Sequence, residues 1–162
     1  FCNPEFYVVQ TGSLIKEINQ IGNFNKEFIQ KISEIIRFKG IKLKEHNADY
    51  LSKEEISLRA GIIDAMNIAP QLGVVQTMFI LRKCLIYGVD FRDFFEEVYQ
   101  EGKWKKWMHN NNPENKLLCC IIAGHYHFSS EKYQKIISKL GEQEDIKDNL
   151  INEIIEVINH YS

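Results

Sequence analysis

The sequence predicts an all-α fold. Apolar residues recur at helical spacing along nearly the whole chain, and Ser, Asp, Asn and Gly stand where the stripes begin and end. At 162 residues, the chain is long enough for one domain with a sizeable core. We therefore expect residues 1–162 to form a single domain, either an irregular bundle or stacked helical hairpins, of about eight helices.

Two apolar stripes predict the first helices. One follows Ser13 and covers residues 14–21, and the other covers residues 28–36 and is stopped by Gly40. Two further segments are extended candidates: residues 6–10 are β-prone and residues 41–46 alternate in polarity. They are long enough to pair with each other but too short to change the predicted class.

The next helix begins at a capping box. Ser52 and Glu55 have the S-x-x-E spacing in which each residue satisfies a backbone donor of the first turn. The apolar residues that follow extend the predicted helix through Ile62 and Met66. Pro70 should end it, because proline is excluded from a helix interior.

Residues 72–87 and 114–125 are the predicted central helices. The first is apolar on most faces, which is typical of a helix buried inside a bundle. The second is started by Asn112 as N-cap and Pro113 as first helical residue, and Gly124 allows it to end.

Three more helices complete the predicted bundle. Asp90 caps a helix over residues 91–99, and Ser129 or Ser130 caps a short helix that Gly141 ends. The last helix covers approximately residues 145–160.

Composition excludes some functions. The net charge is −2 and the isoelectric point is near 6.2, so direct nucleic-acid binding is not expected. No apolar run approaches the ~20 residues of a membrane span, so no membrane association is expected. Four irregularly spaced cysteines do not form a disulfide framework, which favours a cytoplasmic location.

Residues 119–127 contain the densest group of chemically active side chains: Cys119, Cys120, His125 and His127. On one helix the two cysteines would point about 100° apart, and Cys120 and His127 would lie roughly 10 Å apart along the axis. That spacing does not fit a zinc site. We expect small core cysteines and histidines at a helix end, with no metal and no cofactor. Cys120, His125 and His127 remain weak metal candidates, to be completed by a distant carboxylate.

Trp104 and Trp107 alternate with three lysines in "KWKKWMH". This pattern suits a nucleic-acid strand, a membrane surface or a protein interface, but also a helix end with both tryptophans in the core. The overall acidity favours the core.

Carboxylates cluster in residues 90–101 and 142–156. An acidic surface of this kind attracts a basic partner. The predicted partner-binding residues are Asp90, Asp93, Glu96, Glu97, Glu101, Trp104, Trp107, Glu142, Glu144 and Asp145.

Phosphate-loop, dinucleotide, zinc-protease and nucleophile-elbow motifs are absent from the sequence. We therefore expect a non-catalytic protein-binding domain. Its specific form would be an intracellular immunity-type or regulatory protein that sequesters a basic toxin or nuclease through an acidic, aromatic-containing face. Two alternatives stay open: a helical-bundle regulator that binds an amphipathic helix in an apolar groove, and a metal-binding protein or enzyme that uses the 119–127 cluster.

Overall fold

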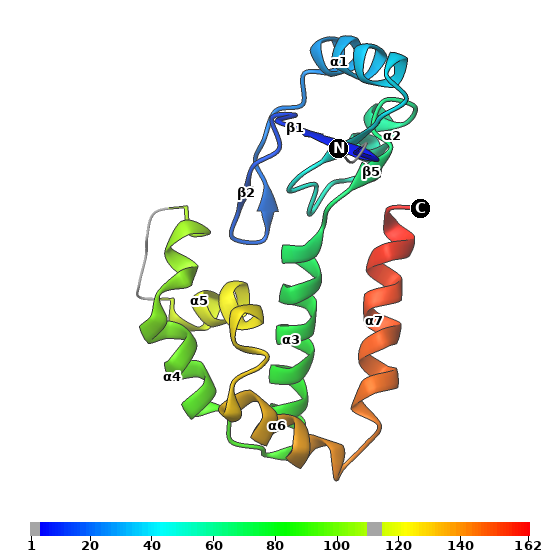
Figure 1. Ribbon diagram of the computed structural model, residues 1–162. Helices are drawn as coiled ribbons and strands as arrows, with labels where there is room; N and C mark the ends of the chain where they lie inside the picture. Colours follow the sequence, from blue (N-terminus) through cyan, green and yellow to red (C-terminus); the bar gives the residue numbers. More distant parts are fainter. Residues whose placement is uncertain (1–3, 110–114) are drawn as a thin grey trace. The chain divides into compact units, whose positions relative to one another are not determined.

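The computed structural model describes residues 4–109 and 115–162, which form two compact units (Figure 1). The first unit extends to Ala69 and the second begins at Pro70. The expectation of a single domain stays a prediction.

The first unit contains a parallel sheet, so the all-α prediction is wrong. Strands β1 (Phe6–Val9), β4 (Lys42–Glu45) and β5 (Ala65–Met66) lie in the order β1-β4-β5, with Phe6 opposite Lys42 and Lys44 opposite Ala65. The two candidate extended segments therefore do pair. They define a small α/β unit because helices connect consecutive parallel strands.

Helix α1 (Lys26–Phe38) connects β1 to β4 and packs on the sheet through Ile29 and Ile36, which contact Leu43. Its predicted stop is confirmed, since Gly40 has a φ of 71°. Asn25 caps its start by accepting a hydrogen bond from the Phe28 N–H.

The predicted helix over residues 14–21 is wrong. Strands β2 (Ile15–Lys16) and β3 (Asn19–Gln20) form an antiparallel hairpin there. The amide oxygen of Gln20 accepts hydrogen bonds from the Leu14 and Gly22 N–H groups, and its nitrogen donates to the Asn47 and Asp49 carbonyls. These bonds favour the hairpin over local helix.

Helix α2 (Lys53–Arg59) has the predicted capping box, with both bonds between Ser52 and Glu55 present. It ends much earlier than predicted, at Arg59. Gly61 follows with a φ of 74°, and the chain then forms β5 instead of continuing as helix.

The second unit is helical within the described residues. It consists of α3 (Ala69–Tyr87), α4 (Arg92–Glu101), α5 (Lys116–Ala123), α6 (Glu131–Gly141) and α7 (Ile146–His160), with short 3₁₀ helices η1 (Lys103–Lys106) and η2 (Gly124–His127). The predicted cap Ser130 is present, and Asp145 caps α7. The predicted cap Asp90 is wrong, because the N-cap of α4 is Phe91, without a side-chain bond. Asn112 and Pro113 lie outside the described residues, and the cap observed for α5 is Asn115.

The core of the second unit is built by both helices predicted to be central. Phe79 and Ile80 of α3 belong to the same buried cluster as Cys120 and Ile122 of α5. Gly124 permits this close approach, because a Cβ there would lie 2.6 Å from the Thr77 methyl group.

Candidate functional sites

His127 joins η2 to α4 through two carboxylates. Its Nδ1 forms a hydrogen bond of 2.9 Å with Glu97 Oε1, and its Nε2 lies 2.6 Å from Glu101 Oε2 without hydrogen-bond alignment. Glu97 also forms an ion pair of 3.1 Å with Lys132 of α6. Glu97 and Glu101 lie on one side of α4 because they are four residues apart. His127, whose possible carboxylate partner the sequence could not identify, thus contacts two carboxylates from another helix.

This arrangement fits an electrostatic link between elements better than a catalytic base or a metal ligand. Nδ1 of His127 is engaged by Glu97 at 2.9 Å and Nε2 lies 2.6 Å from Glu101, and these gaps are too short to hold a metal ion between a nitrogen and its carboxylate. Partial burial, the largest influence, raises the pKa of Glu97, but bonds from His127, Lys132 and Ser130 together outweigh it and leave the pKa below its usual 4.5.

The other predicted metal candidates are not brought together with His127. Cys120 is buried in the core, where burial raises the pKa of its thiol to about 12. His125 packs against Gly73, and burial, helped by Lys106 and His127, lowers its pKa to about 4. Among residues 4–109 and 115–162, no three His, Cys, Asp or Glu side chains are placed to hold a metal ion.

The predicted acidic face is partly neutralised within the unit. Glu144 forms an ion pair of 2.6 Å with Lys83 and accepts a hydrogen bond from the Tyr87 hydroxyl, and Asp145 caps α7. Further ion pairs and hydrogen bonds on this face join Asp90 to Arg92, Glu96 to Gln100 and Lys116, and Glu101 to Lys103. Asp93 and Glu142 are exposed.

The two predicted aromatic site residues differ in burial. Trp104 is only 3% exposed and donates from Nε1 to the Tyr99 carbonyl at 2.9 Å, so its faces are not available to a partner. Trp107 is half-buried and donates to the Tyr126 hydroxyl at 3.2 Å. Trp104 is therefore chiefly a core residue.

Sequence reasoning missed a buried polar cluster in the first unit. Glu45, at the end of β4, forms an ion pair of 2.7 Å with Arg59 and accepts a hydrogen bond of 2.6 Å from the Thr11 hydroxyl. The Ser13 hydroxyl donates to the same carboxylate oxygen. All four side chains are buried. A carboxylate this deep is stable only with such partners.

Polar residues continue from this cluster to the surface at the same edge of the sheet. His46 follows β4 and Asn67 follows β5, and their side chains meet at 3.3 Å between Nδ1 and Nδ2. Since parallel strands end at one edge, all three carboxyl ends present polar groups there. The signal in the sequence was the polar run after each extended segment, "QTGS" and "EHNAD".

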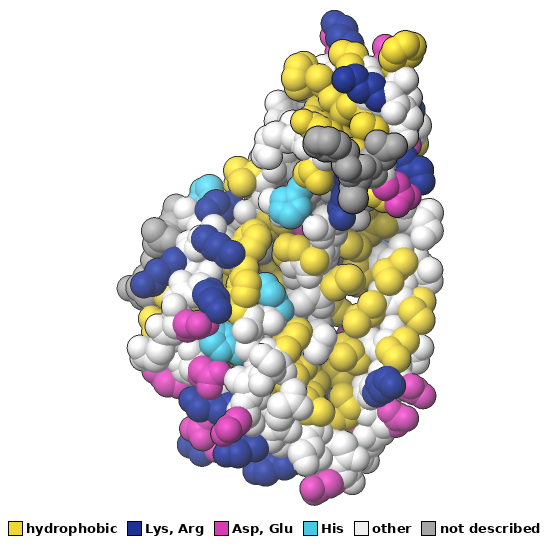
Figure 2. Space-filling view, viewed as in Figure 1, with side chains coloured by type: hydrophobic (Ala, Val, Ile, Leu, Met, Phe, Trp, Pro, Cys, Tyr) yellow, Lys and Arg dark blue, Asp and Glu magenta, His cyan; other side chains and the backbone are white. Residues whose placement is uncertain are grey.

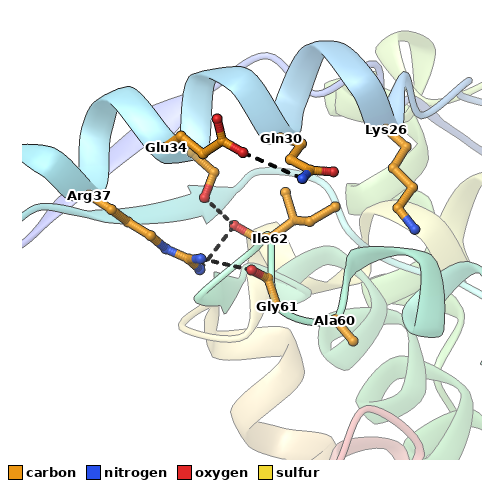
Figure 3. A pocket seen from close by; sticks show the side chains of 8 residues that line it. Lys26, Gln30, Glu34, Arg37, Ala60, Gly61 and Ile62 are labelled. Atoms are coloured by element: carbon orange, nitrogen blue, oxygen red, sulfur yellow. Dashed lines mark hydrogen bonds between the residues drawn. The ribbon is translucent and has the colours of Figure 1, made fainter.

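A separate pocket of about 280 Å³ lies between α1 and residues 60–62. Figure 3 shows Lys26, Gln30 and Arg37 in a row along α1 beside the backbone of that segment. Arg37 is already engaged, donating to the Gly61 carbonyl and to Asp64, both at 2.7 Å. At this pocket Arg37 thus holds α1 to the neighbouring segment.

No helix within the described residues has both the length and the apolar character needed to cross a membrane. No protein-family model matches the chain, and no curated protein matches it either. Geometry therefore carries the functional argument.

Proposed function

We propose that the first unit binds a small hydroxylated metabolite at the carboxyl ends of its parallel strands. The observation that carries this proposal is that β1, β4 and β5 end at one edge, and each is followed there by polar side chains. Open α/β sheets bind their ligands outside the carboxyl ends of the strands.

The chemistry of the edge suggests the ligand class. His46 is exposed and Asn67 is half-buried, so an imidazole and an amide form the accessible rim. Behind them Glu45 and Arg59 neutralise each other. Uncharged donors and acceptors of this kind suit hydroxyl groups better than a strong anion.

Thermal unfolding of the full chain with millimolar monosaccharides, sugar phosphates and, for comparison, amino acids tests this. We expect a hydroxylated compound to raise the unfolding temperature, since a ligand that binds only the native state stabilises it. Asn67→Asp keeps the oxygen that accepts the Ala69 N–H but removes the amide donor. Asn67→Asp and His46→Ala, each as a single variant, should abolish the rise in unfolding temperature. His109→Ala, an exposed histidine of the second unit, is the control.

Equal shifts in His46→Ala, Asn67→Asp and the wild type would overturn this site. So would stabilisation by amino acids alone.

Protein binding by the second unit is the second proposed function, in the immunity-type form described above. The exposed carboxylates Asp93 and Glu142 and the half-buried Trp107 support it, as do the large apolar side chains exposed on α3 and α7. Cys84 and Cys120 are buried and form no disulfide, which is compatible with the cytoplasmic location that belongs to this proposal.

Affinity capture with the full chain at low and high salt tests acidic-face binding. A basic partner should be retained at low salt and released at high salt, because screening weakens contacts between exposed charges. If salt does not change the amount of partner captured, acidic-face binding is wrong. It is also wrong if Asp93→Asn captures as much partner as the wild type at every salt concentration.

A further inference from the structure

We propose that the second unit binds a basic amphipathic helix of a partner protein along α3 and α7. This inference rests on the second proposed function and is independent of the ligand proposed for the first unit. The α3–α7 surface is defined by its exposed apolar side chains: Met78, Leu85, Ile86, Ile151, Ile155 and Ile158.

The two helices lie side by side (Figure 1), and two polar contacts link them. Arg82 of α3 forms an ion pair with Glu153 of α7, and the Tyr161 hydroxyl donates to Gln71 at 2.9 Å. Figure 2 shows apolar side chains gathered along both helices on the same face. Leu85 is 71% exposed and Ile155 45%, so α3 and α7 leave this surface open to solvent.

Helix α7 carries more apolar surface than its own unit covers. Leu150, Ile154 and Val157 are half-buried, whereas Ile151, Ile155 and Ile158 are exposed at spacings of four and three residues. Such spacing places the exposed isoleucines in one stripe along the helix. A contiguous stripe of this kind is typical of a groove that receives another helix.

Charge identifies the kind of helix that fits. Residues 142–160 contain six Asp and Glu residues and one lysine. The nearest cations of α3, Arg82 and Lys83, already pair with Glu153 and Glu144. Asp148 and Glu156 have no ion pair with any residue that the structure describes. A partner helix with lysines or arginines beside its apolar face would complement this charge.

The same charges disfavour the other occupants. Two copies of this unit that met through α7 would bring two surfaces of the same negative charge together, and like charges repel. An anionic membrane surface is disfavoured for the same reason.

Two synthetic peptides of 15 residues, the length of α7, test the proposal. Both have a leucine face, flanked by lysines in one and by glutamates in the other. Fluorescence anisotropy with the full chain should show binding of the lysine peptide, weakened by salt, and little binding of the glutamate peptide.

Variants locate the binding. Ile155→Ser should lower the affinity for the lysine peptide at least about tenfold. Ile35→Ser, the same change at an exposed isoleucine of α1, should change that affinity less than about twofold. Glu156→Gln should reduce the salt dependence. Far-UV circular dichroism verifies that each variant is folded.

Equal binding of the two peptides overturns the proposal, as does equal weakening by Ile155→Ser and Ile35→Ser. Absence of peptide binding overturns it too. If the wild type is then a dimer that Ile155→Ser dissociates, a second copy covers the surface. Failure of the peptides with success of the salt-sensitive capture leaves acidic-face binding standing and rejects only this surface.

Discussion

Glu97 and His127 are 30 residues apart in sequence and 2.9 Å apart in space, with α4 supplying the carboxylate and η2 the imidazole. Their hydrogen bond, together with the Glu97–Lys132 ion pair, connects three elements of the second unit. This link is a consequence of the fold and has measurable effects on stability.

Glu97→Gln should lower the free energy of unfolding of the second unit by about 1–3 kcal/mol, because it removes a charged acceptor from a mostly buried histidine. Urea unfolding measures the change. Glu96→Gln, the neighbouring exposed carboxylate, should change stability by less than about 0.5 kcal/mol. Equal effects would show that the link to His127 contributes nothing.

The stability of the second unit should fall as pH falls. The pKa of His125 is about 4 in the folded protein against 6.5 for an ordinary histidine, so folding favours its neutral form. The stabilisation is complete above about pH 6.5 and decreases towards pH 4, by about 2 kcal/mol between pH 6.5 and about pH 5. His125→Gln should flatten this dependence in urea unfolding, whereas His109→Gln should preserve it. A slope unchanged by His125→Gln contradicts the assignment.

The buried Glu45–Arg59 pair should be essential to the first unit. Arg59→Met leaves a buried carboxylate without its cation and should cost about 3–5 kcal/mol. Hydrogen exchange of the Ala48 amide, which donates to the Asn67 carbonyl at 3.0 Å, reports on this unit alone. The half-exposed pair of Arg37 and Asp64 is the control, and Arg37→Met should cost about 1 kcal/mol or less. Similar protection losses in both variants would be inconsistent with a structural role for the buried pair.

Gly124→Ala should destabilise the second unit by about 1–3 kcal/mol, because the new methyl group would lie 2.6 Å from the Thr77 methyl. Thr77→Ala should partly restore stability in the double variant by making room. Thermal unfolding of both single variants and the double variant measures the coupling. Strictly additive losses would exclude the close contact.

Several of the site residues could be identified from the sequence, but which of them lie together in the fold could not. Glu97, Glu101 and His127 were each predicted as site residues, in different roles, and the structure brings them together as one link. Trp104 was predicted at a partner-binding face and is in the core. The polar strand-end cluster around Glu45 was missed, because its members come from segments up to 48 residues apart, Thr11 to Arg59.

The sequence by itself determined the features that depend on bonds within a few residues. The capping box of Ser52 and Glu55, the stop at Gly40, and helices α6 and α7 follow from side-chain caps, left-handed glycine and apolar spacing. Such features depend on residues close together in the sequence, so a short stretch of sequence is enough to predict them.

Only the tertiary structure decided that residues 14–21 form a hairpin and that the segments around β1, β4 and β5 form a sheet. Residues 14–21 have apolar spacing compatible with a helix, but Gln20 bonds to the Asn47 and Asp49 carbonyls hold a hairpin instead. Strands of two to four residues have weak intrinsic signals and are stabilised by partners that the chain supplies far along the sequence. The physical reason is that a helix completes its backbone hydrogen bonds within its own segment, whereas a strand completes them only against another.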